Sequence, residues 1–274
     1  MKHYIIIDHQ SSEEKFQIRK DKTTGAWKTW PHIKKKYAYK YYKHQAYMPH
    51  KVKPKSLFDV FYGLARKTNN SFKIRHINKR KSKGNMLDFG AGVGTFAAYA
   101  KSKGWIVEAY ETDTDCKKRL KERKITIVEE KLCKKRYDVI TLWHVLEHLN
   151  NPKKTLERLH NSLKSTGRVF IAIPNHSSWD AHHYKENWAA FDVPRHIWHY
   201  NKKSFHKFIK QTGFTIEKTS PMLMDAFYIS ILSEKYRKSK LPYLKGIIKG
   251  FYSNLKGMMK KNTSSLLFCL KKEI

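Results

Sequence analysis

The sequence has few cysteines and no long hydrophobic run. Its three cysteines, Cys116, Cys133 and Cys269, are far apart, so they form neither a disulfide framework nor the closely spaced pairs of a zinc site. Reduced thiols and a cytoplasmic location are therefore expected. No run of roughly 18 apolar residues is present, which argues against a transmembrane helix. The apolar stretch Tyr4–Ile7 is too short for a signal peptide.

Acidic residues are also scarce, with 23 Asp and Glu against 57 Lys and Arg, which gives a net charge of +34. Such a charge favours a polyanionic partner, either nucleic acid or an anionic membrane. Only 11 of the basic residues are Arg, however, and specific recognition of phosphates and bases favours the planar Arg fork. A lysine-rich composition with a solvated surface explains the charge as well. Nucleic acid therefore stays the less favoured partner.

The most informative stretch is Asn85–Gly94, where an apolar strand pattern runs into closely spaced glycines. Asp88 comes shortly before Gly90, Gly92 and Gly94, and a helical pattern follows. A strand, a glycine turn and a helix let the backbone come close to a cofactor at a helix N-terminus. A carboxylate at this point can organise the turn and face an ammonium group, whereas it would repel a pyrophosphate. A nicotinamide dinucleotide is therefore the less favoured cofactor.

A second acidic residue, Glu111, ends the apolar strand pattern over 105–110, where it can accept hydrogen bonds from ribose hydroxyls. This combination resembles the class I S-adenosylmethionine (SAM) methyltransferases. In that family the carboxylate and glycine turn hold the methionine end of SAM, and the acid after the second strand holds the ribose. The resemblance implies SAM as cofactor and a binding site made of Asp88, Gly90, Ala91, Gly92, Gly94, Glu111, Thr112, Leu142 and Trp143.

Strand and helix patterns alternate through the rest of the core, which predicts an α/β fold with a parallel sheet covered on both sides. The resemblance adds a Rossmann-like, seven-stranded, mostly parallel sheet, closed by an antiparallel strand between the fifth and sixth strands. We expect an N-terminal basic and aromatic extension over 1–83 and the SAM-binding methyltransferase domain over 84–274. The domain is expected to contain a helical insertion over about 220–262, before the last strand.

Boundaries of the later elements follow from capping residues and apolar periodicity. Asn151 with Pro152 predicts the start of a helix that stops near Gly167, and Asn201 predicts the cap of another. Later strands are predicted over 125–128, 137–143, 168–174, 214–217 and 265–270.

His144, Glu147 and His148 follow the predicted strand over 137–143, at the edge where open α/β sheets bind ligands. The spacing His-x-x-Glu-His occurs in zinc proteases, but there it lies inside a long helix, whereas here a new helix starts at Pro152. Some ubiquinone-pathway O-methyltransferases, which this region resembles, carry Glu-x-x-Glu-His here and bind a divalent cation. His144 replaces the first glutamate, so no metal is expected. For Glu147 and His148 we favour capping and packing of the helix start or contact with SAM, and metal binding by these two residues is the alternative.

A long segment without clear periodicity, 174–200, follows the predicted fifth strand and is rich in Trp and His. Long loops at the ligand edge of a sheet commonly cover the site. We therefore predict that Trp179, Trp188, Asp192 and Arg195 cover the site or contact the acceptor. The alternative is a loop that packs its own rings beneath the N-terminal region.

A hydroxyl acceptor would need a base whose pKa lies near neutral, and histidine suits this role. His144 is the first candidate and His196 the second. The stretch 143–200 resembles a bacterial group of uncharacterised methyltransferases, the methyltransferase type 23 set common in Bacteroidetes. That resemblance supports methyl transfer and leaves the acceptor undefined.

The segment Asp225–Lys261 carries nine Lys or Arg against two acids, with apolar residues at helical spacing. We expect its apolar face to cap the acceptor site, and docking on an anionic membrane is the alternative. The favoured function is methyl transfer from SAM to an oxygen or nitrogen of a small-molecule or lipid-linked acceptor. An RNA methyltransferase and a non-catalytic SAM-fold protein are the alternatives.

Overall fold

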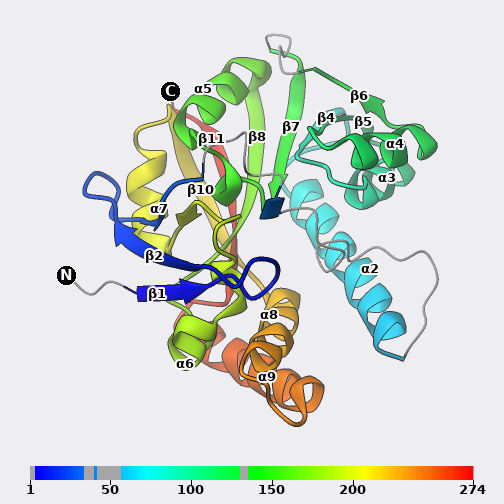
Figure 1. Ribbon diagram of the computed structural model, residues 1–274. Helices are drawn as coiled ribbons and strands as arrows, with labels where there is room; N and C mark the ends of the chain where they lie inside the picture. The colour runs from blue at the N-terminus through cyan, green and yellow to red at the C-terminus, as the bar shows by residue number, and fades with distance from the viewer. Residues whose placement is uncertain (1–3, 34–39, 42–56, 130–134, 274) are drawn as a thin grey trace.

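The computed structural model describes residues 4–33, 40–41, 57–129 and 135–273, with the backbone alone for 57–66. Cys133 lies outside these ranges, and Cys116 and Cys269 are free thiols. Figure 1 shows a central sheet with helices on two sides and further strands from the N-terminal part of the chain. Within the described ranges, no helix has both the length and the apolar character needed to cross a bilayer.

The central sheet has seven strands in the order β10-β11-β8-β7-β4-β5-β6. Six of them point in one direction, and β11 pairs antiparallel with both β8 and β10. The predicted α/β fold, its mostly parallel sheet and its antiparallel closing strand are thereby confirmed. The strands are β4 (Asn85–Phe89), β5 (Ile106–Tyr110), β6 (Thr126–Ile127), β7 (Tyr137–Trp143), β8 (Leu163–Pro174), β10 (Phe214–Met222) and β11 (Ser265–Lys272).

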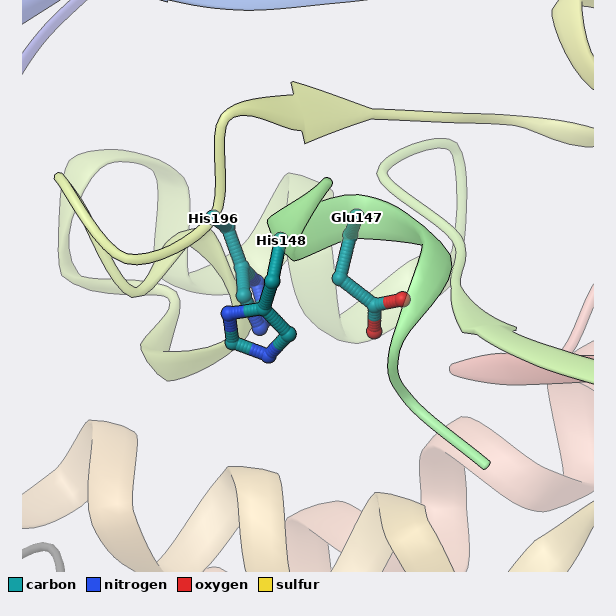
Figure 2. A group of neighbouring side chains, drawn as sticks. All are labelled: Glu147, His148 and His196. Atoms are coloured by element: carbon teal, nitrogen blue, oxygen red, sulfur yellow. The ribbon is translucent and has the colours of Figure 1, made fainter. Parts of the chain in front are cut away.

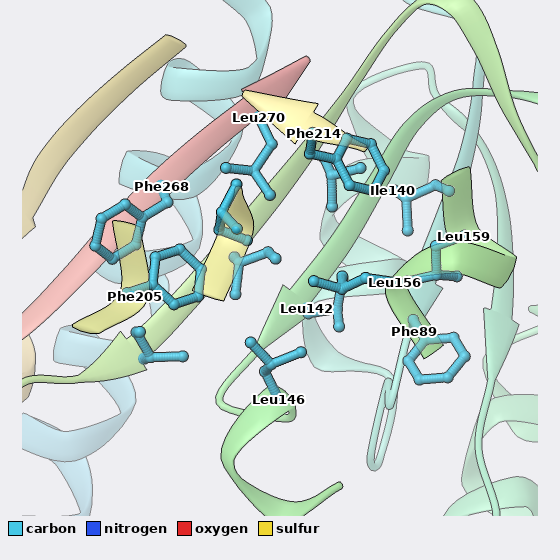
Figure 3. Close-up of a cluster of buried hydrophobic side chains, with 14 of the residues drawn as sticks. Phe89, Ile140, Leu142, Leu146, Leu156, Leu159, Phe205, Phe214, Phe268 and Leu270 are labelled. Carbon is cyan, nitrogen blue, oxygen red and sulfur yellow. The ribbon is translucent and has the colours of Figure 1, made fainter. Parts of the chain in front are cut away.

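Apolar side chains alternate between the two faces of this sheet, as the period of two in a strand requires. Ile140 of β7 packs on one face with Leu156 and Phe205, in the cluster drawn in Figure 3. Val139 packs on the other face with Ile77 and Phe96. Helices α5 and α7 thus cover one face, and α2 and α3 cover the other. The helices of this core are α2 (Leu57–Asn78), α3 (Thr95–Ser102), α4 (Thr114–Glu122), α5 (Pro152–Ser162) and α7 (Lys202–Ile209).

The predicted helix caps are confirmed, but the predicted end of one helix is wrong. The side chains of Asn151 and Asn201 accept hydrogen bonds from the amides of Lys154 and Ser204, at 3.0 and 2.8 Å. Helix α5 ends at Ser162 rather than near Gly167, because the next residues join β8 early, with its first residue opposite Tyr137 of β7.

The insertion before the last strand contains α8 (Leu223–Tyr236) and α9 (Pro242–Met259). It begins later than the predicted residue 220, because β10 continues to Met222, where it pairs with Ser265. The expected inward-facing apolar surface is wrong for α9, since the residues that it buries include Gly246, Gly250 and Gly257. A Cβ at Gly250 would lie only 2.8 Å from the Cα of Phe227, so glycine permits close contact with α8. The large apolar side chains of α9 face outward instead.

The N-terminal residues form part of a second sheet that the sequence analysis did not anticipate. Its order is β1-β2-β3-β9, with antiparallel pairing throughout. Buried Phe16 and Ile18 alternate with polar neighbours in β2, a pattern that would have indicated a half-buried strand. The boundary after residue 83 stays a prediction. The strands are β1 (Tyr4–Ile7), β2 (Lys15–Lys20), β3 (Trp27–Trp30) and β9 (Trp198–His199).

Candidate active site

The turn after β4 lies at the carboxyl edge of the central sheet and contains the predicted glycines. Its backbone is left-handed at three of them, with φ of 75° at Gly90, 55° at Gly92 and 75° at Gly94. Glycine adopts this conformation at little cost because it has no Cβ. The amides of Gly90 and Ala91 donate to the carbonyl of Tyr110, at 2.8 and 3.2 Å, and so tie the turn to the end of β5.

Glu111 connects the turns that follow β4 and β5. One carboxylate oxygen accepts a hydrogen bond from the amide of Gly92 at 2.7 Å. The other accepts from the amides of Thr112 and Asp113, at 2.6 and 3.0 Å. A carboxylate has further lone pairs, so Glu111 can still accept hydrogen bonds from hydroxyl groups of a ligand. These bonds hold the carboxylate beside the glycine turn.

Only one of the three glycines of this turn faces open space. A Cβ at Gly90 would lie 2.6 Å from Cγ2 of Val145, and one at Gly94 would lie 2.5 Å from Cδ2 of Leu120. A Cβ at Gly92 would meet nothing within 4 Å. Gly90 and Gly94 therefore serve the packing of the protein itself, whereas Gly92 leaves room for a bound molecule.

Two buried polar atoms lie in the elements that flank this turn and lack a hydrogen-bond partner. They are Oγ1 of Thr95, the first residue of α3, and Nε1 of Trp143, the last residue of β7; the described residues offer neither atom a partner. Buried polar atoms are normally paired. Unpaired buried donors in the elements around a turn suit a site that binds a polar ligand.

Asp88 is buried beside this turn, and burial raises the pKa of its carboxyl to about 6. Its Oδ1 accepts a hydrogen bond from the Thr141 hydroxyl at 2.7 Å. The ammonium group of Lys73, from α2, interacts electrostatically with Asp88 and lies 4.5 Å from the ring centre of Trp143. The ammonium group that faces Asp88 in this structure is thus one of the protein's own.

His144 follows β7 with a left-handed backbone, at φ 54°, and joins two carboxylates. Its Nε2 lies 2.9 Å from Oδ2 of Asp225, and its Nδ1 lies 3.3 Å from Oε1 of Glu147. Burial lowers the pKa of His144, but the two carboxylates outweigh burial and raise that pKa to about 10. The imidazole is therefore protonated near neutral pH. It can act as the predicted base only after losing that proton.

Glu147, His148 and His196 bring three possible metal ligands together, as Figure 2 shows. One ligand atom from each lies within 4.8 Å of the others. Oε2 of Glu147 is buried and has no hydrogen-bond partner in the described part of the chain. Sequence analysis named the first two residues as candidate ligands, and the structure adds His196.

The two histidines of this cluster are oriented as metal-binding histidines commonly are. Nδ1 of His148 lies 3.0 Å from the carbonyl oxygen of Arg195, and Nδ1 of His196 lies 2.8 Å from that of Ala190. A carbonyl oxygen only accepts, so each Nδ1 carries a proton, and in the neutral form of each ring the lone pair is on Nε2. Burial lowers the pKa of His148 to about 4, which keeps His148 neutral. Backbone carbonyls fix metal-ligating histidines in the same way.

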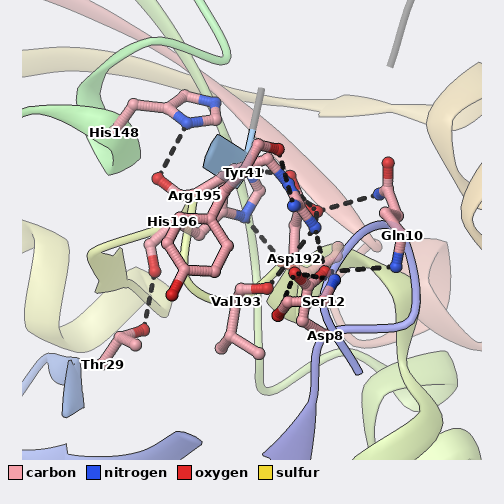
Figure 4. Close-up of polar contacts among 11 residues, drawn as sticks. Asp8, Gln10, Ser12, Thr29, Tyr41, His148, Asp192, Val193, Arg195 and His196 are labelled. Atoms are coloured by element: carbon pink, nitrogen blue, oxygen red, sulfur yellow. Dashed lines mark hydrogen bonds and ion pairs between the residues drawn. The ribbon is translucent and has the colours of Figure 1, made fainter. Parts of the chain in front are cut away.

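The other residues predicted to cover the site make their contacts inside the protein. Arg195 donates from Nη2 to Oδ1 of Asp8 at 2.8 Å and pairs with Oδ1 of Asp192 at 2.7 Å (Figure 4). Gln10 also donates to Asp192, at 2.9 Å. These bonds join the 174–200 segment to the N-terminal strands. They match the packing alternative, and the predicted acceptor contacts of Asp192 and Arg195 stay a prediction.

The two tryptophans of this group also contact protein groups. Trp188 is buried and donates from Nε1 to Oδ2 of Asp180 at 2.7 Å. Trp179 stacks on His183, with ring centres 4.7 Å apart, and meets Tyr252 of α9 edge-on. The 174–200 segment contains three short helices, α6 (Trp179–Tyr184), η3 (Lys185–Asn187) and η4 (Ala189–Phe191). A further short helix, η2 (Leu146–His148), contains Glu147 and His148.

Sequence reasoning missed two charged residues of the site. Lys73 lies on α2, within the predicted extension, and Asp225 lies at the start of α8, within the predicted insertion. Lys73 interacts electrostatically with Asp88 of β4, and Asp225 interacts with His144, which follows β7. Neither lies in a recognisable motif, because their contacts arise only from tertiary packing.

Residues 59–219, more than half of the 274-residue chain, match the model of the methyltransferase 23 family, described as a methyltransferase domain. A comparison with the curated proteins found no match.

The fold is similar to several solved structures. One is phosphoethanolamine N-methyltransferase 2 of Haemonchus contortus with phosphomonomethylethanolamine and S-adenosylhomocysteine (TM-score 0.57, 18% identity, 90% of this chain and 62% of that one). A second is a possible histamine N-methyltransferase of Thermotoga maritima (TM-score 0.54, 12% identity, 77% of this chain and 93% of that one). A third is a SAM-dependent methyltransferase of Archaeoglobus fulgidus (TM-score 0.52, 17% identity, 79% of this chain and 100% of that one). The chain spans less than two thirds of the nematode enzyme. At these identities the likeness concerns the fold.

Proposed function

Because the chain belongs to the methyltransferase 23 family, we propose that it transfers the methyl group of SAM to an oxygen or nitrogen of a small-molecule or lipid-linked acceptor. SAM supplies an already activated methyl group, so the protein mainly has to hold the donor, align the acceptor and exclude water. A closer relation to the ubiquinone-pathway O-methyltransferases stays a prediction.

The open space at Gly92 carries this proposal. Gly92 is bounded by the fixed carboxylate of Glu111, and Thr95 and Trp143 in the adjoining elements keep unpaired polar atoms. The backbone at Gly92 would allow close approach of SAM, and Glu111 would accept hydrogen bonds from its ribose hydroxyls. The predicted ligand Thr112 lies just after β5, and the predicted ligand Leu142 is the last residue but one of β7.

The charged groups around this space favour a cationic ligand. Asp88, Glu111, Glu147 and Asp225 supply four negative charges when ionised, and Lys73 and protonated His144 supply two positive ones. The group therefore has a net charge of about −2, which attracts a sulfonium ion in a partly buried site. His144 holds the two carboxylates in place, and His196, with its Nε2 lone pair, stays the candidate base for a hydroxyl acceptor.

Calorimetry with SAM and with S-adenosylhomocysteine tests the donor site. The unaltered protein should bind both, and the two should compete. Glu111→Gln should weaken binding about tenfold to a hundredfold, because it removes hydrogen bonds to a charged acceptor worth roughly 1.5–3 kcal/mol. Gly92→Val should abolish binding by filling the open space. Glu122→Gln, at an exposed position on α4, serves as the matched control. Absence of binding by well-folded, unaltered protein would refute the proposal.

Transfer of a labelled methyl group tests the acceptor. The protein and labelled SAM are incubated separately with an aqueous metabolite extract, a lipid extract and total RNA. Label in the first or second extract, lost in Gly92→Val, identifies a small-molecule or a lipid-linked acceptor. Label in RNA alone would replace the proposed acceptor class, while SAM binding without transfer to any extract would favour a non-catalytic protein.

A further inference from the structure

Helix α9 exposes a continuous row of large apolar side chains. Ten of the fifteen exposed large hydrophobic residues in the described ranges lie between Leu241 and Met259. Phe251, at the middle of the row, is 64% exposed. Large exposed apolar patches on a protein mark surfaces that contact another molecule. The row, here called the α9 apolar face, consists of Leu244, Ile247, Ile248, Phe251, Leu255 and Met258.

The α9 apolar face points away from the protein. Its members recur at intervals of three or four residues and so form one stripe along the helix. The buried residues of α9, among them Gly246, Gly250 and Gly257, recur at similar intervals on a different side of the helix and contact α8 and the residues before β11. The small residues thus attach the helix to the protein, and the large apolar residues are left for a partner.

The charged residues of α9 itself are all basic. Nine Lys or Arg lie between 235 and 261, and the chain contains no Asp or Glu from 235 through 272. On the wheel of α9, Lys245, Lys249 and Lys256 fall between the apolar stripe and the buried stripe, so they line one edge of the exposed face. This is the pattern of an amphipathic helix that lies in an anionic interface.

A basic groove opens beside the same face. It has a volume of about 520 Å³, and Ile248 lines it together with Arg237, Lys245 and Lys249. His183 lies in the same groove, and burial, then the positive charges of Lys249 and Arg237, lower its pKa. Glu234 is the acidic group of the lining. Positive charge next to an apolar surface suits the phosphate of a lipid whose chains lie beside it.

We propose that the α9 apolar face docks on an anionic membrane surface. The apolar side chains enter the boundary between head groups and acyl chains, and the flanking lysines contact lipid phosphates. A second copy of this chain fits the surface less well. Pairing two α9 faces would bring their lysine rows together on proteins that already carry a net charge of +34. This inference goes beyond the proposed function and does not depend on it.

Vesicle flotation with the full chain tests the proposal. The vesicles contain phosphatidylcholine alone or phosphatidylcholine with phosphatidylglycerol. We expect the protein to float with the anionic vesicles and to lose binding as salt rises, because the screening length falls to about 3 Å at 1 M ionic strength. Each Lys→Gln change at Lys245, Lys249 or Lys256 should lower the partition coefficient about fivefold. Phe251→Glu should lower it more than tenfold.

Ile106→Glu supplies the matched control, because Ile106 is 67% exposed on β5, away from α9. It should float as the unaltered protein does, and SAM binding measured on every variant should remain unchanged. Failure to float with anionic vesicles would overturn the proposal. Equal flotation of Phe251→Glu would also overturn it, since another basic surface would then bind. Self-association that Phe251→Glu abolishes, without flotation, would assign the face to a second copy.

Discussion

The glycine turn after β4 and the segment 174–200 both contribute to one side of the molecule, yet they use their polar groups in opposite ways. At the turn, Gly92 borders open space, and Trp143 keeps an unpaired nitrogen, with no partner among the described side chains. In the segment, Trp188 and Arg195 are buried and fully engaged with other protein groups. The first region has room for a ligand, and the second joins two sheets.

This difference shows which observations carry functional information. Tryptophan, aspartate and arginine in a long loop suggest a binding surface, but each can equally hold a loop in place. Open space, unpaired buried atoms and a local excess of one charge are harder to explain by packing. Substitutions in the two regions should therefore separate into losses of stability and losses of binding.

The largest effect is expected at Arg195. Arg195→Met removes the positive charge that faces buried Asp8 and lowers the pKa of its carboxyl, and it leaves that carboxylate uncompensated. Breaking a buried ion pair from one side costs about 3–5 kcal/mol of the free energy of unfolding. Urea unfolding should show this loss, while the protein that remains folded should bind SAM with unchanged affinity.

Two further variants keep this test decisive if Arg195→Met fails to fold. Gln10→Ala removes one hydrogen bond to Asp192 and should cost about 1 kcal/mol of stability, with SAM affinity intact. Gly92→Val should do the reverse, losing SAM with a stability change of about 1–2 kcal/mol from the left-handed backbone. A Gln10→Ala protein of normal stability that binds SAM weakly would place the segment in the donor site.

A smaller effect is expected from the charge of Asp88. Burial raises the pKa of Asp88 to about 6, so the carboxyl takes up a proton as pH falls through 6. Protonation removes one negative charge from the group around the donor site. For unit charges about 8 Å apart at an effective dielectric constant of about 20, this costs roughly 2 kcal/mol of binding. SAM affinity should fall accordingly between pH 7 and 5, measured by calorimetry.

Asp88→Asn provides the control for this titration. Its SAM affinity should be low at every pH, without the step near 6, because the amide does not titrate in this range. The raised pKa also fixes the sign for stability. The pKa of Asp88 is 3.8 in the unfolded state, so the folded state holds the Asp88 proton more tightly. The contribution of Asp88 to the free energy of unfolding is therefore lost as pH rises through 6. An affinity step that persists in Asp88→Asn would assign it to another group.

Much of the fold could be predicted from sequence because its signals are local. Asp88, the glycine turn and Glu111 lie within one strand–turn–helix–strand unit, where spacing fixes position. The cap residues Asn151 and Asn201 likewise act within one helical turn. The family match covers the same stretch of chain.

The parts that sequence did not predict depend on contacts between distant segments. Lys73 comes from α2, before the glycine turn in the chain, and Asp225 comes from α8, far after it. The predicted orientation of α9 was wrong because helical spacing defines an apolar stripe but does not indicate which side of the helix faces the protein. The small residues determine which side of α9 packs on the protein, since Gly246 and Gly250 allow α8 to approach where larger side chains would collide.

The smallest effect concerns the cluster of Glu147, His148 and His196, which lies between the two regions. Two imidazole nitrogens and a carboxylate suit Zn²⁺ better than Mg²⁺, which prefers oxygen ligands. If the cluster binds Zn²⁺, a tenfold excess over the dissociation constant stabilises the folded protein by about 1.4 kcal/mol. For a chain of this size that raises the melting temperature by about 2–5 °C. Glu147→Gln and His148→Gln should remove the shift, and His206→Gln on α7 should keep it. A shift that survives both cluster variants would place the ion elsewhere, and no shift with the unaltered protein would leave Glu147 as a partner of His144 alone.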